Sequence, residues 1–147
     1  VKFPPDIVDI CKKSPAHFFF MPGPSWMKID RNISISPYQC KTEKVAEFLG
    51  KGNCFWYLLP AGYTDQGPRV IVEAMAAGLP VIAENRDGAK DRVTTETGWL
   101  IDKHDEIVDL LHSIEFEDLR QKGIAARRRA IENFKPGLWY EKITGEQ

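Results

Sequence analysis

One stretch of the sequence, residues 54–83, constrains the fold most, because it has the pattern of a complete strand, helix and strand. It begins with the unbroken apolar run 54–59, which is typical of a strand buried on both faces of a parallel sheet. Pro68 suits the first helical position, since its fixed φ is helical and its missing N–H would have no partner there. Gly78 suits the left-handed position just past a helix end. Residues 81–83 then predict the second strand.

A short polar loop joins the first strand of this unit to its helix. Open α/β sheets bind ligands at the carboxyl ends of their strands, where a helix N-terminus offers unpaired N–H groups and a positive dipole end to an anion. The sequence therefore predicts a phosphate site at the start of the helix. Because proline has no N–H, the possible donors are the backbone amides of Gly67, Arg69 and Val70.

At these residues the chain resembles the donor-binding half of a GT-B-fold glycosyltransferase, and it is most similar to the large retaining family 4. That family carries two acidic residues with seven between them, and the second opens the run E-A-M-A-x-G-x-P-V-I-A. Asp65 and Glu73 take the two acidic places, and residues 73–83 fit the run without a gap. The resemblance implies that Asp65 acts catalytically at the donor sugar and that Glu73 hydrogen-bonds the nucleotide ribose. The implied diphosphate site is the helix start, formed by Gln66, Gly67, Pro68, Arg69 and Val70.

This segment departs from the family pattern in two places, and its second acid also has a simpler interpretation. Asp65 is one methylene shorter than the usual glutamate, and residues 66–69 replace a small glycine-rich turn. Glu73 follows Arg69 by four residues, and such a pair stabilises a helix by about 0.2–0.5 kcal/mol without any ligand. Glu73 therefore has two possible roles, stabilising the helix through Arg69 or binding the nucleotide ribose.

Two earlier strands are predicted to end at the same sheet edge, and their following turns add candidate ligand contacts. The apolar run 17–21 precedes a turn around Gly23, which matches the family's G-x-G-P after its second strand. The alternating run 32–36 precedes Tyr38 and Gln39, and the resemblance implies that these two lie beside the nucleotide base. A surface tyrosine in a turn is the alternative for Tyr38.

The remaining elements are predicted from apolar periodicity and end signals. We expect helices near residues 7–11, 43–49, 107–114 and 115–133, and a final strand in residues 94–101. Residues 84–90 are predicted to form a polar loop, with Asn85, Arg86 and Lys90 as further phosphate candidates. The resemblance implies that residues 87–89 take the place of the family's glycine-rich turn. In the last long helix we expect Leu119 and Ile124 to face inward, residues 127–129 to form a solvated helix end, and Trp139 and Tyr140 to follow in a short exposed helix.

Composition excludes several classes of protein. Twenty basic and twenty-one acidic residues give a net charge of −1, so no overall field attracts nucleic acid. Cys11, Cys40 and Cys54 lack metal-ligand or redox-pair spacing, and no metal site is predicted. The longest apolar run is far shorter than the roughly 18 residues of a transmembrane helix, and the N-terminus has no signal-peptide pattern. We expect a cytoplasmic protein, with peripheral membrane association as an alternative for the full-length protein.

These observations predict a doubly wound α/β domain with a mostly parallel, Rossmann-like sheet, one half of a GT-B fold. Residues 1–147 are expected to be the nucleotide-sugar donor domain, inactive alone, with the N-terminal acceptor domain, the first strand and its basic loop absent. The implied reaction is retaining transfer from a nucleoside diphosphate sugar to a carbohydrate, lipid or protein acceptor, with no cofactor. The alternatives are a non-catalytic nucleotide-binding domain and half of a GT-B-like nucleotide-sugar epimerase.

Overall fold

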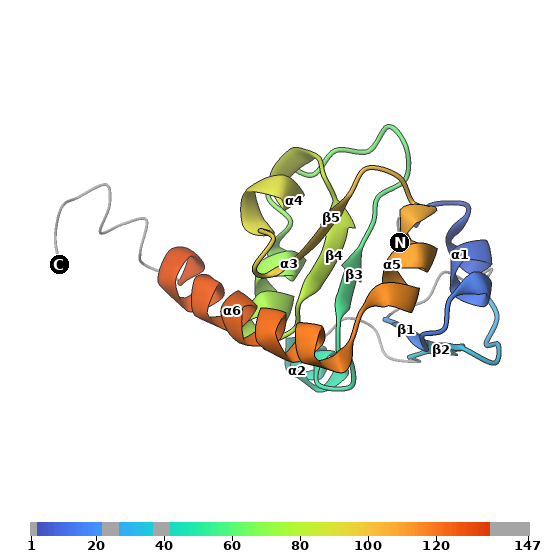
Figure 1. Ribbon diagram of the computed structural model, residues 1–147, viewed down its shortest axis with the longest axis horizontal. Helices are drawn as coiled ribbons and strands as arrows, with labels where there is room; N and C mark the ends of the chain where they lie inside the picture. Colours follow the sequence, from blue (N-terminus) through green and yellow to red (C-terminus); the bar gives the residue numbers. More distant parts are fainter. Residues whose placement is uncertain (1–2, 22–26, 37–41, 136–147) are drawn as a thin grey trace, which may run out of the picture.

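The computed structural model describes residues 3–21, 27–36 and 42–135, and these form an α/β domain (Figure 1). Each helix and strand predicted within these residues is present, and most of the strands are shorter than expected. In chain order the elements are α1 (Ile7–Lys13), β1 (Phe18–Phe20), β2 (Ile33–Ile35), α2 (Thr42–Leu49), β3 (Phe55–Tyr57), α3 (Arg69–Ala76), β4 (Val81–Glu84), α4 (Asp87–Arg92), β5 (Gly98–Ile101), α5 (Glu106–Ser113) and α6 (Phe116–Phe134).

All strand pairs are parallel, as predicted, and they form two sheets. β1 pairs with β2, and the second sheet has the order β3-β4-β5. No backbone ladder joins β1 to β3 in the described strands. The two sheets instead meet through side chains, with the rings of Phe18 and Trp56 5.2 Å apart between centroids. The aromatic residues of β1 and β3 thus join the two sheets into one core.

Helices cover both faces of the three-stranded sheet, which confirms the doubly wound arrangement (Figure 1). Successive residues of a strand point to opposite faces. Val81 and Ala83 of β4 accordingly pack toward α3, α4 and α6, whereas Ile82 packs toward α1 and α5. β4 is the strand that is buried on both faces. We expected this of β3, but β3 is an edge strand and its three residues are only partly buried.

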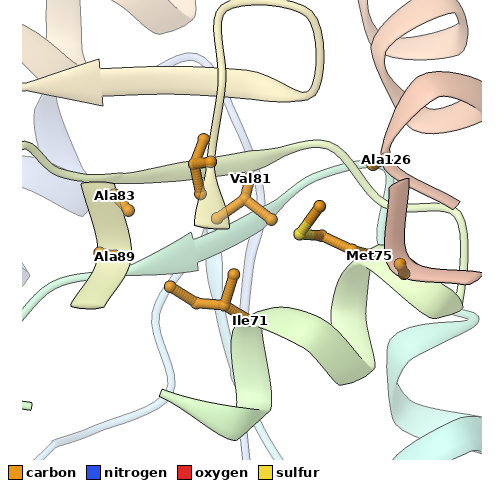
Figure 2. Packing of buried hydrophobic residues seen from close by; sticks show 8 residues of the cluster. Ile71, Met75, Val81, Ala83, Ala89 and Ala126 are labelled. Carbon is orange, nitrogen blue, oxygen red and sulfur yellow. The ribbon is translucent and has the colours of Figure 1, made fainter. Parts of the chain in front are cut away.

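The core on the α3 side of the sheet is built from one apolar face of α3 (Figure 2). Ile71 and Met75 are fully buried there and contact the residues of β4. α6 closes this core through small residues, namely Gly123, Ala126 and Ala130. A Cβ added to Gly123 would lie 2.4 Å from the carbonyl oxygen of Gly78, so only glycine permits this close approach.

The inward face of α6 differs in part from the predicted one. Ile124 is 58% exposed, and Leu119 is only partly buried. The inward face passes through residues 123, 126 and 130, because small side chains let the helix backbone approach the end of α3. The helix itself is present as predicted, but its buried face is formed by small residues and not by the large apolar ones.

The two ends of α3 follow the expected chemistry, with a shift of one residue at its start. Pro68 is the residue just before the helix, and Arg69 is the first helical residue. At the other end Gly78 has φ +85°, in the left-handed region that favours glycine. The N–H of Gly78 donates to Met75 O at 2.9 Å, and the N–H of Leu79 donates to Ala74 O at 3.0 Å. These two bonds form the Schellman motif that ends the helix.

The arginines near the end of α6 are not simply a solvated helix end. Arg127 Nη1 donates to the carbonyl of Ala76, the last residue of α3, at 2.9 Å. Arg129 donates to the carbonyls of Asp91 and Arg92 at the end of α4, at 3.0 and 2.9 Å. Carbonyls at helix ends lack partners within the helix, and cations there are favoured by the helix dipole. Arg127 and Arg129 therefore cap two neighbouring helices and fix α6 against them.

Candidate functional site

The candidate site lies at the carboxyl edge of the β3-β4-β5 sheet. The loop 58–68 leaves β3 there and leads into α3, and the segment between β4 and α4 leaves the neighbouring strand at the same edge. Ligands of open α/β sheets bind at this edge. Loop 58–68 also contains the first acidic candidate, Asp65, and ends at the predicted phosphate-binding helix start.

Asp65 is partly buried, and both oxygens of its carboxylate have partners. Tyr57 Oη donates to Asp65 Oδ2 at 2.7 Å, and the N–H of Gly67 donates to Asp65 Oδ1 at 3.0 Å. Burial, followed by the hydrogen bond to Asp65, raises the pKa of Tyr57, so this phenol stays a donor across the physiological range. The contacts hold Asp65 in one position at the end of β3.

The start of α3 offers two backbone donors. The amides of Arg69 and Val70 have no hydrogen-bond acceptor among the described residues, whereas Ile71 N–H donates to Pro68 O at 3.2 Å. Both residues are exposed. Of the three predicted donors, Gly67 is already bonded to Asp65. The amides of Arg69 and Val70 are thus the two predicted donors that remain without an acceptor in the described part of the chain.

Glu73 lies one turn further along α3 and faces solvent. Its Oε1 lies 3.5 Å from Arg69 Nε, and the two side chains are 45% and 90% exposed. This is the helix pair that the simpler interpretation predicts, worth at most about 0.5 kcal/mol. Glu73 is not among the described residues that line the small cavity beside Asp65.

A cavity of about 10 Å³ lies beside Asp65, which is room for about one water molecule. Two of its polar lining residues, Tyr57 and Glu84, were not among the predicted site residues. Tyr57 ends β3, Glu84 ends β4, and Arg86 and Asp87 follow at the start of α4. Their position at the last residue of a strand, at the ligand-binding edge, was the signal that could have identified Tyr57 and Glu84.

Glu84 is the centre of this cluster. Its Oε2 accepts the N–H of Leu59 at 2.8 Å, and both of its oxygens are bonded to Arg86 at 3.1 Å. His104 Nε2 lies 3.1 Å from Glu84 Oε1, and His104 Nδ1 lies 3.3 Å from Asp6 Oδ1. Burial alone would raise the pKa of Glu84, but the hydrogen bonds from Arg86, Leu59 and His104 outweigh it and lower this pKa.

This lowered pKa predicts a loss of stability in acid. The folded protein binds the proton of Glu84 less readily than the unfolded chain does, so the stabilisation is complete above the ordinary pKa of about 4.5 and is lost as the pH falls below it. We expect urea unfolding of Glu84→Gln to show a smaller decrease in the free energy of unfolding between pH 6 and pH 3 than the wild type. Glu132→Gln, on the exposed part of α6, is the control. Identical pH profiles of the wild type and Glu84→Gln would contradict the prediction.

The segment after β4 differs from the predicted phosphate-binding loop. α4 already begins at Asp87, so residues 87–89 form its first turn and not a separate glycine-rich turn. Arg86 turns inward to Glu84, and Asn85 Nδ2 donates to Asp102 Oδ1 at 3.1 Å. Asp87 has φ +51°, an uncommon conformation for a residue other than glycine. The side chains of Asn85 and Arg86 are therefore engaged with other protein groups.

Three of the predicted ligand contacts, Gly23, Tyr38 and Gln39, lie outside the described residues, as do Trp139 and Tyr140. Within residues 3–21, 27–36 and 42–135, no group of three or more histidine, cysteine, aspartate or glutamate side chains is arranged to hold a metal ion. In the same ranges, no helix has the length and apolar character that crossing a membrane requires.

The arrangement is that of a Rossmann-like domain whose strand-to-helix loop presents backbone donors at the sheet edge. The chain belongs to the glycosyl transferases group 1 family, whose model matches residues 28–135. None of the curated proteins matches the sequence significantly. Among solved structures, the one titled "Crystal Structure of TarM" matches with a TM-score of 0.59 and 22% sequence identity, over 78% of this chain. The match covers 23% of the TarM chain, so this chain spans less than a quarter of its length.

The chain therefore belongs to a family of glycosyl transferases, and the structural likeness supports the fold. The family match extends from residue 28 to the end of α6, so it includes Asp65, Glu73 and the whole strand-to-helix loop. The predicted resemblance and fold class are thereby confirmed. The roles of the individual site residues are taken up below as proposals.

Proposed function

We propose that residues 1–147 are the nucleotide-sugar donor domain of a retaining glycosyltransferase. The observation that carries the proposal is the pair of N–H groups of the exposed residues Arg69 and Val70, which have no acceptor among the described residues and lie at the start of α3, at the carboxyl edge of the sheet. A helix N-terminus of this kind binds phosphate groups well. The acceptor, a carbohydrate, lipid or protein, and the other half of the enzyme would be supplied outside this domain, in a cytoplasmic or membrane-peripheral setting.

In this proposal the leaving diphosphate is stabilised by fixed dipoles. Negative charge grows on the diphosphate as the glycosyl bond breaks, and donors that are already oriented stabilise it without reorganisation. The amides of Arg69 and Val70 supply two such donors, and the exposed guanidinium of Arg69 adds a positive charge at the same helix end. Gln66, Gly67 and Pro68 would contact the diphosphate from the preceding loop.

Asp65 would accept hydrogen bonds from hydroxyls of the donor sugar. Its carboxylate is bonded to Gly67 N–H and Tyr57 Oη, so a sugar hydroxyl that replaces Gly67 would release this amide toward the diphosphate. Glu73 would leave Arg69 and bind the ribose, while Gly23, Tyr38 and Gln39 would lie near the donor from the neighbouring loops. No cofactor or metal ion is part of the proposal.

Calorimetric titration with UDP, GDP and their sugar conjugates tests this function. We expect saturable binding of one nucleotide, weakened at least about tenfold in Glu73→Ala, because hydrogen bonds to charged groups contribute about 1.5–3 kcal/mol. Glu132→Ala replaces an exposed glutamate on α6 and is the matched control. Equal affinity of the folded Glu73→Ala protein and the wild type would contradict the ribose role. Absence of binding by both this chain and the full-length enzyme would contradict the donor-domain proposal.

A further inference from the structure

We propose that the junction between β4 and α4, residues 84–88, is a clamp that holds the loop 59–67, and that Arg86 is its principal positioning residue. The clamp would set the position of Asp65, and its importance for catalysis rests on the donor-domain proposal above. It acts through the loop, and none of its residues needs to touch the substrate. Hydrogen bonds from three residues of the junction, Glu84, Arg86 and Gly88, to the loop carry this inference.

The first contacts are made by the side chains of Glu84 and Arg86. Glu84 Oε2 accepts the N–H of Leu59 at 2.8 Å. Arg86 Nη2 donates to Leu59 O at 3.2 Å, and Arg86 Nη1 donates to Tyr63 O at 2.6 Å. The Glu84 carboxylate also fixes the guanidinium in place at 3.1 Å. One ion pair thus binds both polar groups of Leu59 and reaches across the loop to Tyr63.

The remaining contact is made by the backbone of Gly88. Its N–H donates to Asp65 O at 3.0 Å, directly at the candidate acid. A Cβ at this position would lie 2.2 Å from Gln66 O and 2.9 Å from Pro68 Cδ. Only glycine therefore allows the start of α4 to lie against the loop. Between Arg86 and Gly88, Asp87 adopts φ +51°, so the backbone takes an unfavourable conformation where the two segments meet.

Much of the loop is exposed, so contacts from neighbouring segments help to hold it in place. Residues 61–64, 66 and 67 are exposed, and loops with few buried contacts open easily. Within the loop, the backbone bond that the structure shows is Tyr63 N–H to Pro60 O at 3.2 Å. Three carbonyls of the segment, those of Leu59, Pro60 and Tyr63, lie within hydrogen-bonding distance of one guanidinium. Arg86 is therefore the side chain whose removal should loosen the loop most.

Tyr57 reports the position of Asp65. Burial and the hydrogen bond to Asp65 raise the pKa of this phenol, and the nearby charge of Arg86 lowers it. Two possible roles of Arg86 predict opposite changes in the pKa of Tyr57 when Arg86 is replaced. If Arg86 acts only as a charge, its loss raises the Tyr57 pKa further. If Arg86 positions the loop, Asp65 moves away from Tyr57 and the phenol becomes more accessible to water, so the pKa falls toward its usual value near 10.

The test compares Arg86→Met and Arg86→Lys with Arg120→Met, which breaks an exposed ion pair with Glu117 on α6. Hydrogen exchange of the Leu59, Tyr63, Gly67 and Gly88 amides is measured by NMR, and Tyr57 is titrated through its ¹³C-labelled ring. For Arg86→Met we expect at least tenfold faster exchange at these amides and a lower Tyr57 pKa, with Arg86→Lys intermediate and Arg120→Met unchanged. Unchanged exchange, or a Tyr57 pKa that stays the same or rises, would overturn the clamp.

Titrating the same proteins with UDP, GDP and their sugar conjugates separates this inference from the proposed function. If the wild type binds a nucleotide sugar, we expect Arg86→Met to weaken binding of the sugar conjugate more than binding of the nucleotide alone, because Asp65 would contact the sugar. Equal weakening of both would overturn the link from the clamp to Asp65. If the full-length wild type binds none of them, the proposed function fails, and exchange and the Tyr57 titration still decide whether the clamp exists.

Discussion

Gly98→Ala is expected to destabilise the domain by about 3 kcal/mol or more. The added methyl group would overlap backbone atoms that cannot move aside, and such overpacking costs more than most point substitutions. Gly98 opens β5 beside the central strand β4. A Cβ there would lie 1.9 Å from Val81 O and 2.9 Å from Val81 N. Val81 is fully buried and bonded into the sheet on both sides, so it cannot shift without breaking the ladder.

Urea unfolding followed by circular dichroism measures this effect. Gly50→Ala is the matched control, since the nearest atom to its added Cβ is Ala46 O at an ordinary contact distance of 3.5 Å. We expect the control to change the unfolding free energy by less than about 1 kcal/mol. A Gly98→Ala protein with the stability of the control would show that β4 and β5 do not pair as described.

Ile71→Ala is expected to cost about 3–4 kcal/mol, the usual range for deleting a large buried aliphatic side chain. Ile71 is 0% exposed and lies where α3, β4 and α4 meet (Figure 2). Its neighbours include Met75 and Val81, which are themselves fully buried, so the surroundings can close the cavity only in part.

Ile131→Ala provides the matched comparison, because it makes the same chemical change at a helix position that is 54% exposed. Its effect should lie within about 0.5 kcal/mol, since little apolar area is lost and alanine favours the helix. Denaturant midpoints of the two variants give the difference directly. Equal destabilisation by the two substitutions would contradict the assignment of Ile71 to the core and of Ile131 to the surface.

The parts of this fold that were predictable are those with local causes. Gly78 ends α3 because the left-handed conformation at that position favours glycine, and this preference can be read from the sequence alone. The unit β3, α3 and β4 likewise follows from a short apolar run, a proline and a second apolar run within thirty residues. Its family resemblance depends on the same contiguous segment, which is why that prediction also held.

The parts that were missed depend on contacts between distant segments. Arg127 and Arg129 cap helices that end more than thirty residues earlier, and a run of basic residues gives no indication of such partners. Gly123 determines the inward face of α6 because Gly78 O lies against it. The sequence instead suggested Ile124, since a large apolar residue in an amphipathic helix is usually taken to be buried.

The candidate site combines both cases. The seven-residue spacing of Asp65 and Glu73 correctly placed one acid in the loop and the other on α3. The sequence could not show that Asp65 is bonded to Tyr57 and Gly67, because an acid after a strand has several possible partners. Glu84 and Arg86 were recognisable as polar residues at the right sheet edge. The hydrogen bonds that join them to loop 59–67 could be identified only once the positions of both segments were known.

The central claim is that the start of α3 binds the diphosphate of a nucleotide sugar. The most direct measurement is titration of the ¹⁵N-labelled chain with UDP and GDP, followed through the backbone amide signals. The account predicts saturable shifts that are largest at the amides of Arg69 and Val70, the two exposed donors without an acceptor in the described part of the chain. Saturable shifts centred elsewhere, with Arg69 and Val70 unmoved, would contradict it.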